Sequence, residues 1–264
     1  MLAVKNVTVT FNPGTPIQTR ALEDLSLTIP SGEFVTVIGS NGAGKSTLLN
    51  AISGEVTIDR GAIEIDQAEV SYLPVWERAQ QVARVFQDPL AGTCEDLTIE
   101  ENLALAAGRG LRRGLGSAVN PALRQDFQQQ LASLGLGLEN RLTDRIGLLS
   151  GGQRQAVSLL MAALRPSRIL LLDEHTAALD PRTAEFVLAL TEKIVKEHEL
   201  TTMMVTHSMR QALQVGTRTI MLHQGRVMLD VHGSQREGMS VTDLLEMFQR
   251  DQGVAVTDDS LLLS

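Results

Sequence analysis

Alternating apolar and polar positions dominate the first forty residues of the chain. Residues 2–11 carry β-branched side chains in partial alternation, and residues 25–29 alternate strictly. Both patterns are typical of half-buried strands. The mostly apolar segment 33–38 predicts a buried strand that leads into a glycine-rich segment, and residues 45–52 continue with helical spacing. Residues 56–70 are again rich in strand formers.

From Thr98 onward the pattern becomes mainly helical. Thr98 and Glu101 have the spacing of a capping box ahead of a helix over 102–107, and a second helix is predicted over 121–134. From Ser150 the chain alternates between helices at 153–164, 182–197 and 209–214 and strands at 169–172, 202–206 and near 220 and 227. Alternation of this kind predicts an α/β fold with a mostly parallel sheet between helices.

Composition narrows the class of protein. The 264 residues are 43% hydrophobic and 20% charged, which is typical of a globular domain. No apolar run approaches the ~18 residues that a membrane-spanning helix needs. The net charge of −8 and the 3% of aromatic residues argue against a nucleic-acid partner.

The segment 39–46, Gly-Ser-Asn-Gly-Ala-Gly-Lys-Ser, has the phosphate-loop pattern between a predicted strand and a predicted helix. Glycines let backbone N–H groups surround a triphosphate, and the helix adds the positive end of its dipole. Lys45 would contribute a charge for the β- and γ-phosphates, and the Ser46 hydroxyl would bind Mg²⁺. A glycine-rich turn without a ligand is the alternative.

Two further segments could complete a nucleotide site. The apolar strand at 169–172 ends in Asp173 and Glu174, and ligands of open parallel sheets lie at the carboxyl ends of strands. Asp173 would hold Mg²⁺ and Glu174 would polarise the attacking water. Residues 149–153, Leu-Ser-Gly-Gly-Gln, begin a helix whose exposed N–H groups suit a second anion contact. Solvated acids and an ordinary helix N-cap are the alternatives.

Over residues 2–249 the chain resembles the ATP-binding-cassette (ABC) ATPases, which are P-loop NTPases. The resemblance is carried by six motifs in family order, and it implies an antiparallel β subdomain and an inserted helical subdomain over about 90–160. The motifs are the Walker A loop (39–47), the Q-loop residue Gln87, the signature (149–153), Walker B (169–174), the D-loop residue Asp180 and the switch residue His207.

The resemblance also implies the roles of individual residues. ATP would be bound by Phe11, Gly39, Ser40, Asn41, Gly42, Ala43, Gly44, Lys45, Ser46, Thr47 and Gln87, with Ser46, Gln87 and Asp173 as Mg²⁺ ligands. Glu174 and His207 would be catalytic, Asp180 would act across a dimer, and Ser150, Gly151, Gly152 and Gln153 would contact the ATP of the other subunit. Phe11 would stack on adenine, although a phenylalanine at a strand end is also typical of a core.

One residue departs from the family pattern. His175 stands directly after Glu174, where the family usually has proline. Proline would fix φ at this turn, and histidine leaves it free. A histidine that hydrogen-bonds locally or titrates is one interpretation. We expect the other, that His175 is a tolerated surface substitution.

The resemblance further implies the partners of the chain. They are a second copy with two shared ATP sites, an integral membrane permease and an extracytoplasmic substrate-binding protein, at the cytoplasmic face of the inner membrane. The sequence is similar to importer ATPases whose implied cargo is amino acids, aromatic ones among them. An exporter or lipid-extraction ATPase, a soluble ABC ATPase and a nucleotide-dependent scaffold without turnover are the alternatives. Residues 250–264 are expected to form a flexible tail.

Overall fold

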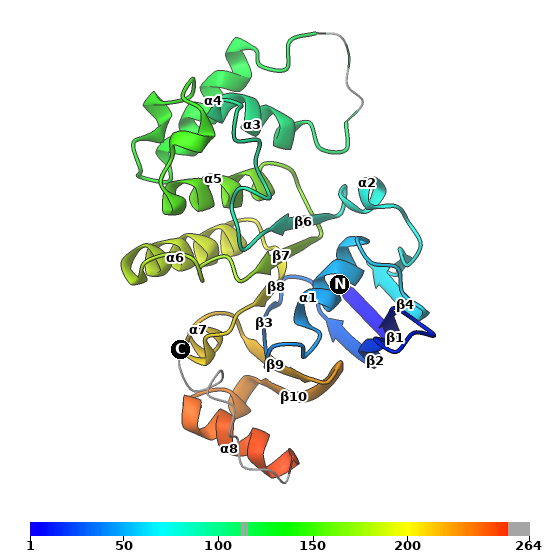
Figure 1. Ribbon diagram of the computed structural model, residues 1–264. Coiled ribbons are helices and arrows are strands. Elements are labelled where there is room, and N and C mark those ends of the chain that lie inside the picture. Colours follow the sequence, from blue (N-terminus) through cyan, green and yellow to red (C-terminus); the bar gives the residue numbers. More distant parts are fainter. Residues whose placement is uncertain (112–113, 115, 253–264) are drawn as a thin grey trace. The chain divides into compact units, whose positions relative to one another are not determined.

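The computed structural model (Figure 1) describes residues 1–111, 114 and 116–252. It divides into two compact units, which are taken in turn: Met1–Arg78 together with the chain from Glu199 onward, and Ala79–His198. Among the described residues, none of the helices combines the length and the apolar character needed to cross a membrane.

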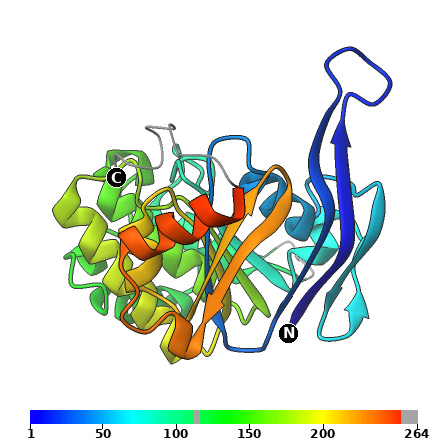
Figure 2. The same cartoon turned by 90° about the horizontal axis from the view of Figure 1, so that it is seen from below.

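The first unit contains an antiparallel sheet built from the alternating segments at the start of the chain. Its strands are β1 (Leu2–Phe11), β2 (Thr19–Ile29), β4 (Arg60–Ile65) and β5 (Ala68–Glu69), in the order β2-β1-β4-β5. Strands β1 and β2 form the long hairpin seen in Figure 2. Leu25, Leu27 and Ile29 are buried and the residues between them are exposed, as the alternation predicts.

A second group of strands in this unit carries the glycine-rich segment. β3 (Phe34–Ile38) is parallel to both β8 (Thr201–Val205) and β9 (Arg218–His223), and β10 (Arg226–His232) is antiparallel to β9. Every residue of β3 is buried, as expected for a strand with neighbours on both sides. The helices are α1 (Lys45–Ser53), α2 (Val75–Arg78), α7 (Met209–Gln214) and α8 (Val241–Gln252), with a 3₁₀ turn at Gly233–Gln235.

Side chains from β3, β9, β10, α7 and α8 pack together in this part. Ile38, Met209, Met221, Leu229 and Leu244 belong to one buried cluster. Helix α8 ends at Gln252, three positions beyond the residue 249 at which we expected the ATPase domain to end. Residues 253–264 of the expected tail lie outside the described residues, so the tail stays a prediction.

In the part of it that the structure describes, the second unit combines two parallel strands with four α-helices. β6 (Val82–Val85) pairs in parallel with β7 (Ile169–Asp173). The helices are α3 (Ile99–Ala107), α4 (Pro121–Ala132), α5 (Gly151–Ala163) and α6 (Pro181–Glu197), with 3₁₀ turns at Leu138–Asn140 and Ile146–Leu148. The predicted capping box of Thr98 and Glu101 is present at the start of α3.

Candidate nucleotide site

The phosphate loop follows β3 directly, and its backbone conformation requires glycine. Gly39, Gly42 and Gly44 have φ values of 148°, 77° and 103°. A Cβ atom on Gly44 would lie 2.6 Å from the carbonyl oxygen of Ala21, and one on Gly39 would clash with the Leu222 carbonyl. Open space surrounds the Cβ position of Gly42. The loop is therefore tightly held at its two ends and open at its middle, as a cradle for phosphates must be.

Lys45 begins helix α1 and places a charge inside this loop. Its side chain is buried, and Nζ donates hydrogen bonds to the carbonyl oxygens of Gly39 at 2.7 Å and Ser40 at 3.1 Å. The next residue, Ser46, is exposed, and Thr47 is half-buried. The loop thus combines a buried cation, a helix N-terminus and the exposed Gly42, and this combination fits a triphosphate.

His207 lies at the same edge of the sheet as the phosphate loop. β3 and β8 are parallel, with Val37 opposite Val205, and the Thr206 N–H donates to the Val37 carbonyl oxygen at 3.1 Å. The chain turns away from this edge because Ser208 caps helix α7 by accepting from the Gln211 N–H. The structure therefore brings His207 close to the start of the loop within the first unit.

Phe11 ends strand β1 and is 39% exposed. It pairs with Thr19 on β2, two residues before Ala21, whose carbonyl oxygen packs against Gly44. Phe11 is therefore a surface aromatic on the hairpin that abuts the phosphate loop. This position suits a stacking role better than a core role.

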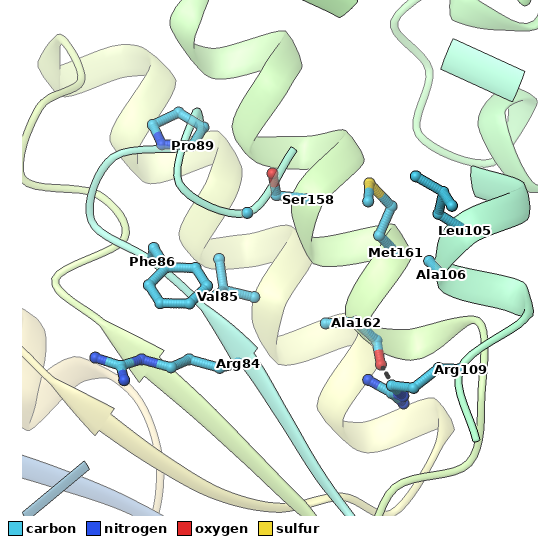
Figure 3. Close-up of a pocket in the computed structure, with 11 residues that line it drawn as sticks. Arg84, Val85, Phe86, Pro89, Leu105, Ala106, Arg109, Ser158, Met161 and Ala162 are labelled. Atoms are coloured by element: carbon cyan, nitrogen blue, oxygen red, sulfur yellow. Dashed lines mark hydrogen bonds between the residues drawn. The ribbon is translucent and has the colours of Figure 1, made fainter. Parts of the chain in front are cut away.

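In the second unit, Gln87 comes shortly after β6, and Asp173 is the last residue of β7, with which β6 pairs. Val85 on β6 lies opposite Leu172 on β7, so both residues emerge at one edge. Gln87 is exposed, and Asp173 forms a 2.7 Å ion pair with Arg84. The Arg84 guanidinium lies 4.7 Å from the centre of the Phe86 ring. Figure 3 shows both side chains together.

A pocket of about 280 Å³ lies beside the start of the Q-loop (Figure 3). The fully buried Gln155 of α5 donates from Nε2 to the Phe86 carbonyl oxygen at 3.3 Å, which ties the signature helix to the residue before Gln87. Residues that line the pocket include Arg84, Phe86, Pro89, Leu105, Arg109 and Met161.

The turn after β7 holds Glu174 in an unusual conformation. Its φ is +45°, in the left-handed region that non-glycine residues seldom adopt, and its carbonyl oxygen accepts from the Ala177 N–H at 2.9 Å. The next residue, His175, is 2% exposed and lies 2.9 Å, Nε2 to Oγ1, from Thr191 of α6. Burial lowers the pKa of His175 to about 4, so the ring is neutral at neutral pH. Our expectation of a surface substitution was wrong, because the side chain turns inward against α6.

The signature and the D-loop meet in the second unit. Ser150 and Gln153 form the predicted capping box at the start of α5. A Cβ on Gly152 would collide with the Thr183 methyl group, and one on Gly151 would lie 3.5 Å from Leu179.

Asp180 caps the opposite helix of this contact, α6. Its Oδ1 accepts from the Thr183 N–H at 3.1 Å, and the Thr183 hydrogen bonds lower the pKa of the carboxyl group. Its side chain is otherwise exposed beside the helix N-terminus. The first turns of α5 and α6 are therefore packed together without space for an added methyl group.

Three residues that the sequence did not single out support the site: Arg84, Gln155 and Thr191. Their partners, Asp173, Phe86 and His175, are 89, 69 and 16 positions away in the chain. The arginine within an otherwise apolar strand was a usable signal for Arg84, whereas nothing local marked the other two.

Comparisons with known proteins agree with this geometry. Residues 22–177 match the family model described as ABC transporter. The chain is 46% identical to a tyrosine transport ATP-binding protein of Clostridioides difficile (strain R20291), over 94% of this chain and 99% of that protein. It is 36% identical to the thiamine import ATP-binding protein ThiQ of Escherichia coli O157:H7, over 76% of this chain and 82% of that protein.

Among solved structures, the chain is similar to a dimeric, post-hydrolysis ATP-binding cassette bound to ADP and Pi. The TM-score is 0.75 at 32% identity, and the match covers 88% of this chain and 98% of that one. A nucleotide-free cassette of an ABC transporter matches with a TM-score of 0.77 at 20% identity, which concerns the fold alone.

Proposed function

The chain belongs to the ABC transporter family, and from this membership we propose that it is the ATP-hydrolysing subunit of a bacterial importer. The observation that carries the proposal is the phosphate loop, whose glycine-dependent conformation and buried Lys45 are built to hold a triphosphate. The fold is accordingly that of a P-loop NTPase, with a mostly parallel core sheet, an antiparallel β subdomain and an inserted helical subdomain. The boundaries of the helical part, about 90–160, stay a prediction.

The proposed ATP-binding residues belong to the first unit, except for Gln87, which belongs to the second. Backbone N–H groups of residues 39–47 and Lys45 Nζ would surround the phosphates, and the exposed face of Phe11 would stack on the base. His207 would donate to the γ-phosphate from the adjoining strand end. Neutralising the phosphate charge in place, without reorganising water, is the main contribution such a site makes to phosphoryl transfer.

Hydrolysis is assigned to residues that follow β7. Glu174 would orient the attacking water or accept a proton from it. The backbone conformation of Glu174 determines the direction in which its side chain leaves the turn. Mg²⁺ would be held by Ser46, Asp173 and Gln87, and it supplies charge compensation for the phosphates when bound. The hard oxygen donors of these three side chains suit that ion, and Arg84 balances the Asp173 charge.

A second copy of the chain would complete each site. The signature residues Ser150, Gly151, Gly152 and Gln153 stand at the N-terminus of α5, where Ser150 and Gly151 are exposed and available to an anion. Asp180 is exposed at the N-terminus of α6. The dimeric state of the related cassette supports a homodimer with two equal ATP sites. ATP would join the copies, and hydrolysis would release them.

The partners in the membrane are also part of the proposal. An integral permease would carry the substrate and an extracytoplasmic protein would deliver it, with this chain at the cytoplasmic face of the inner membrane. The similarity to a tyrosine transport ATP-binding protein supports amino acids, aromatic ones included, as cargo. No nucleic acid is expected among the partners.

Two experiments test the proposal. The Glu174→Gln variant should bind ATP, hydrolyse it very slowly and sediment as a dimer with ATP but not with ADP, whereas Lys45→Ala should remain a monomer with either nucleotide. A pull-down from detergent-solubilised membranes should recover an integral permease. Recovery of ribosomes or nucleic acid alone, or a Glu174→Gln variant that stays monomeric with ATP, would contradict the proposal.

A further inference from the structure

The buried pair His175 and Thr191 joins the turn after β7 to the middle of α6. The Thr191 hydroxyl lies 2.8 Å from the Val187 carbonyl oxygen, one helical turn earlier. A carbonyl oxygen can only accept, so the hydroxyl proton is directed to Val187. Thr191 Oγ1 is then an acceptor, and His175 Nε2, at 2.9 Å, must donate. The geometry therefore places a proton on Nε2, and burial, which lowers the pKa of the ring to about 4, keeps the ring neutral at neutral pH.

This bond lies next to a backbone conformation that is costly to maintain. Glu174, with φ of +45°, occupies a region that costs a non-glycine residue about 1–2 kcal/mol, and such conformations persist only where their surroundings enforce them. Contacts that hold the turn include the Ala177 N–H bonded to the Glu174 carbonyl oxygen, the Leu179 N–H bonded to the Thr176 carbonyl oxygen, and the anchored side chain of His175. Of these, the His175 side chain reaches outside the turn, to Thr191 of α6.

We propose that the hydrogen bond from His175 to Thr191 positions the Glu174 carboxylate for attack of water on ATP. The inference rests on the proposed function. His175 and Thr191 are positioning residues, because neither is placed to touch the nucleotide: both side chains are buried, at 2% and 0% exposure, against α6. The family's usual proline restrains this position through its ring. Here a side-chain bond to a helix provides the restraint.

Stability alone does not account for the pair. A neutral buried hydrogen bond adds only about 1 kcal/mol to the free energy of unfolding, and two apolar groups of the same shape would serve nearly as well. What a directed bond adds is one defined orientation of the residue after Glu174. Misplacing a catalytic group by about 1 Å can reduce a rate by about a hundredfold, so a small loss of orientation would be visible in turnover.

The test compares variants on both sides of the bond in the full-length protein. Thr191→Val and His175→Leu remove it, whereas Thr191→Ser keeps the hydroxyl and His175→Gln keeps an N–H donor near the Nε2 position. We expect kcat for ATP hydrolysis to fall roughly ten- to hundredfold in the first two, with the Kd for ATP unchanged. The two conservative variants should stay within about threefold of the wild type.

A second comparison asks whether the effect passes through Glu174. In a Glu174→Gln background, Thr191→Val should cause no further loss of the residual hydrolysis, because the carboxylate that it would misplace is gone. Urea unfolding and the Kd for ATP, measured on every variant, identify any variant that fails to fold. If Thr191→Val fails to fold, the comparison of His175→Leu with His175→Gln tests the inference instead.

Three outcomes would overturn the inference: wild-type kcat in both bond-removing variants, parallel loss of kcat and ATP binding in all four, or an additive loss in the Glu174→Gln background. Absence of ATP hydrolysis by the wild type would instead contradict the proposed function.

Discussion

Replacing Gly152 with alanine adds one methyl group where the first turns of α5 and α6 are in contact. The added Cβ would overlap the Thr183 methyl group, while the Thr183 Cβ and Oγ1 would be 3.5 and 3.8 Å away. The clash is therefore with a single atom. Both residues lie in the first turns of their helices, beside Ser150 and Asp180, which cap α5 and α6.

The magnitude follows from two opposing terms. Inserting a methyl group into a packed contact costs about 1–3 kcal/mol, and alanine in place of glycine in a helix returns at most about 1 kcal/mol. We therefore expect Gly152→Ala to lower the free energy of unfolding by about 1–2 kcal/mol in urea titrations. The rate of ATP turnover should fall by more than tenfold, because the signature helix must move away from α6 to relieve the overlap.

The matched control is Thr183→Ser, which removes the clashing methyl group and leaves the backbone N–H that bonds to Asp180. The double variant Gly152→Ala, Thr183→Ser should recover most of the lost stability and turnover, since its nearest remaining contact is an ordinary 3.5 Å. If the double variant were as impaired as Gly152→Ala alone, the cause would not be this contact, and the packing argument would fail.

The remaining predictions concern charge and protonation. Lys45→Ala should weaken ATP binding at least about tenfold in a fluorescent-nucleotide titration, because it removes the buried cation of the phosphate loop. The conservative Lys45→Arg should retain part of the affinity. An equal loss of affinity in both variants would indicate that packing, and not charge, is the cause. Glu174→Gln should keep the Kd for ATP and lower phosphate release at least about a hundredfold, and near-normal release would disprove its assignment. His175 has a folded-state pKa of about 4, below the value of 6.5 for an unfolded chain, so the unfolded state binds the extra proton as the pH falls. The contribution of the buried, neutral His175 to the free energy of unfolding, measured without nucleotide or divalent ions, should therefore be fully present above pH 6.5. As the pH falls towards 4, the wild type should lose up to about 3 kcal/mol more than His175→Gln. Equal losses in the two proteins would contradict the burial argument.

Most elements of the fold could be predicted because their signals are local. The strands at the start of the chain follow from alternation, and the helix that begins at Gly151 follows from the Ser150 capping box, only two positions before its predicted start. The phosphate loop is likewise contiguous in sequence, and its glycines occur where φ is positive. In each case the residues that determine the conformation are neighbours in the chain.

The supporting contacts of the site could not be predicted for the opposite reason. His175 is a polar residue after an acidic pair, and only its fold partner Thr191 explains why it is buried. Arg84 is paired with Asp173 only because β6 and β7 lie side by side. Choices between distant partners depend on tertiary packing, which a pattern of local residue types does not contain.

Helix α6 links features that the sequence presents as separate motifs. Its first turn accepts the D-loop residue Asp180 as its cap and packs against Gly152 of the signature. Two turns later, Thr191 receives the hydrogen bond from the residue next to Glu174. Within one copy, the proposed catalytic carboxylate and the signature, which would contact the ATP of the other copy, are thus both held by contacts with α6. A displacement of α6 would therefore alter both. In a dimer in which only one copy carries a substitution that shifts α6, we expect hydrolysis to be impaired at both ATP sites rather than at one.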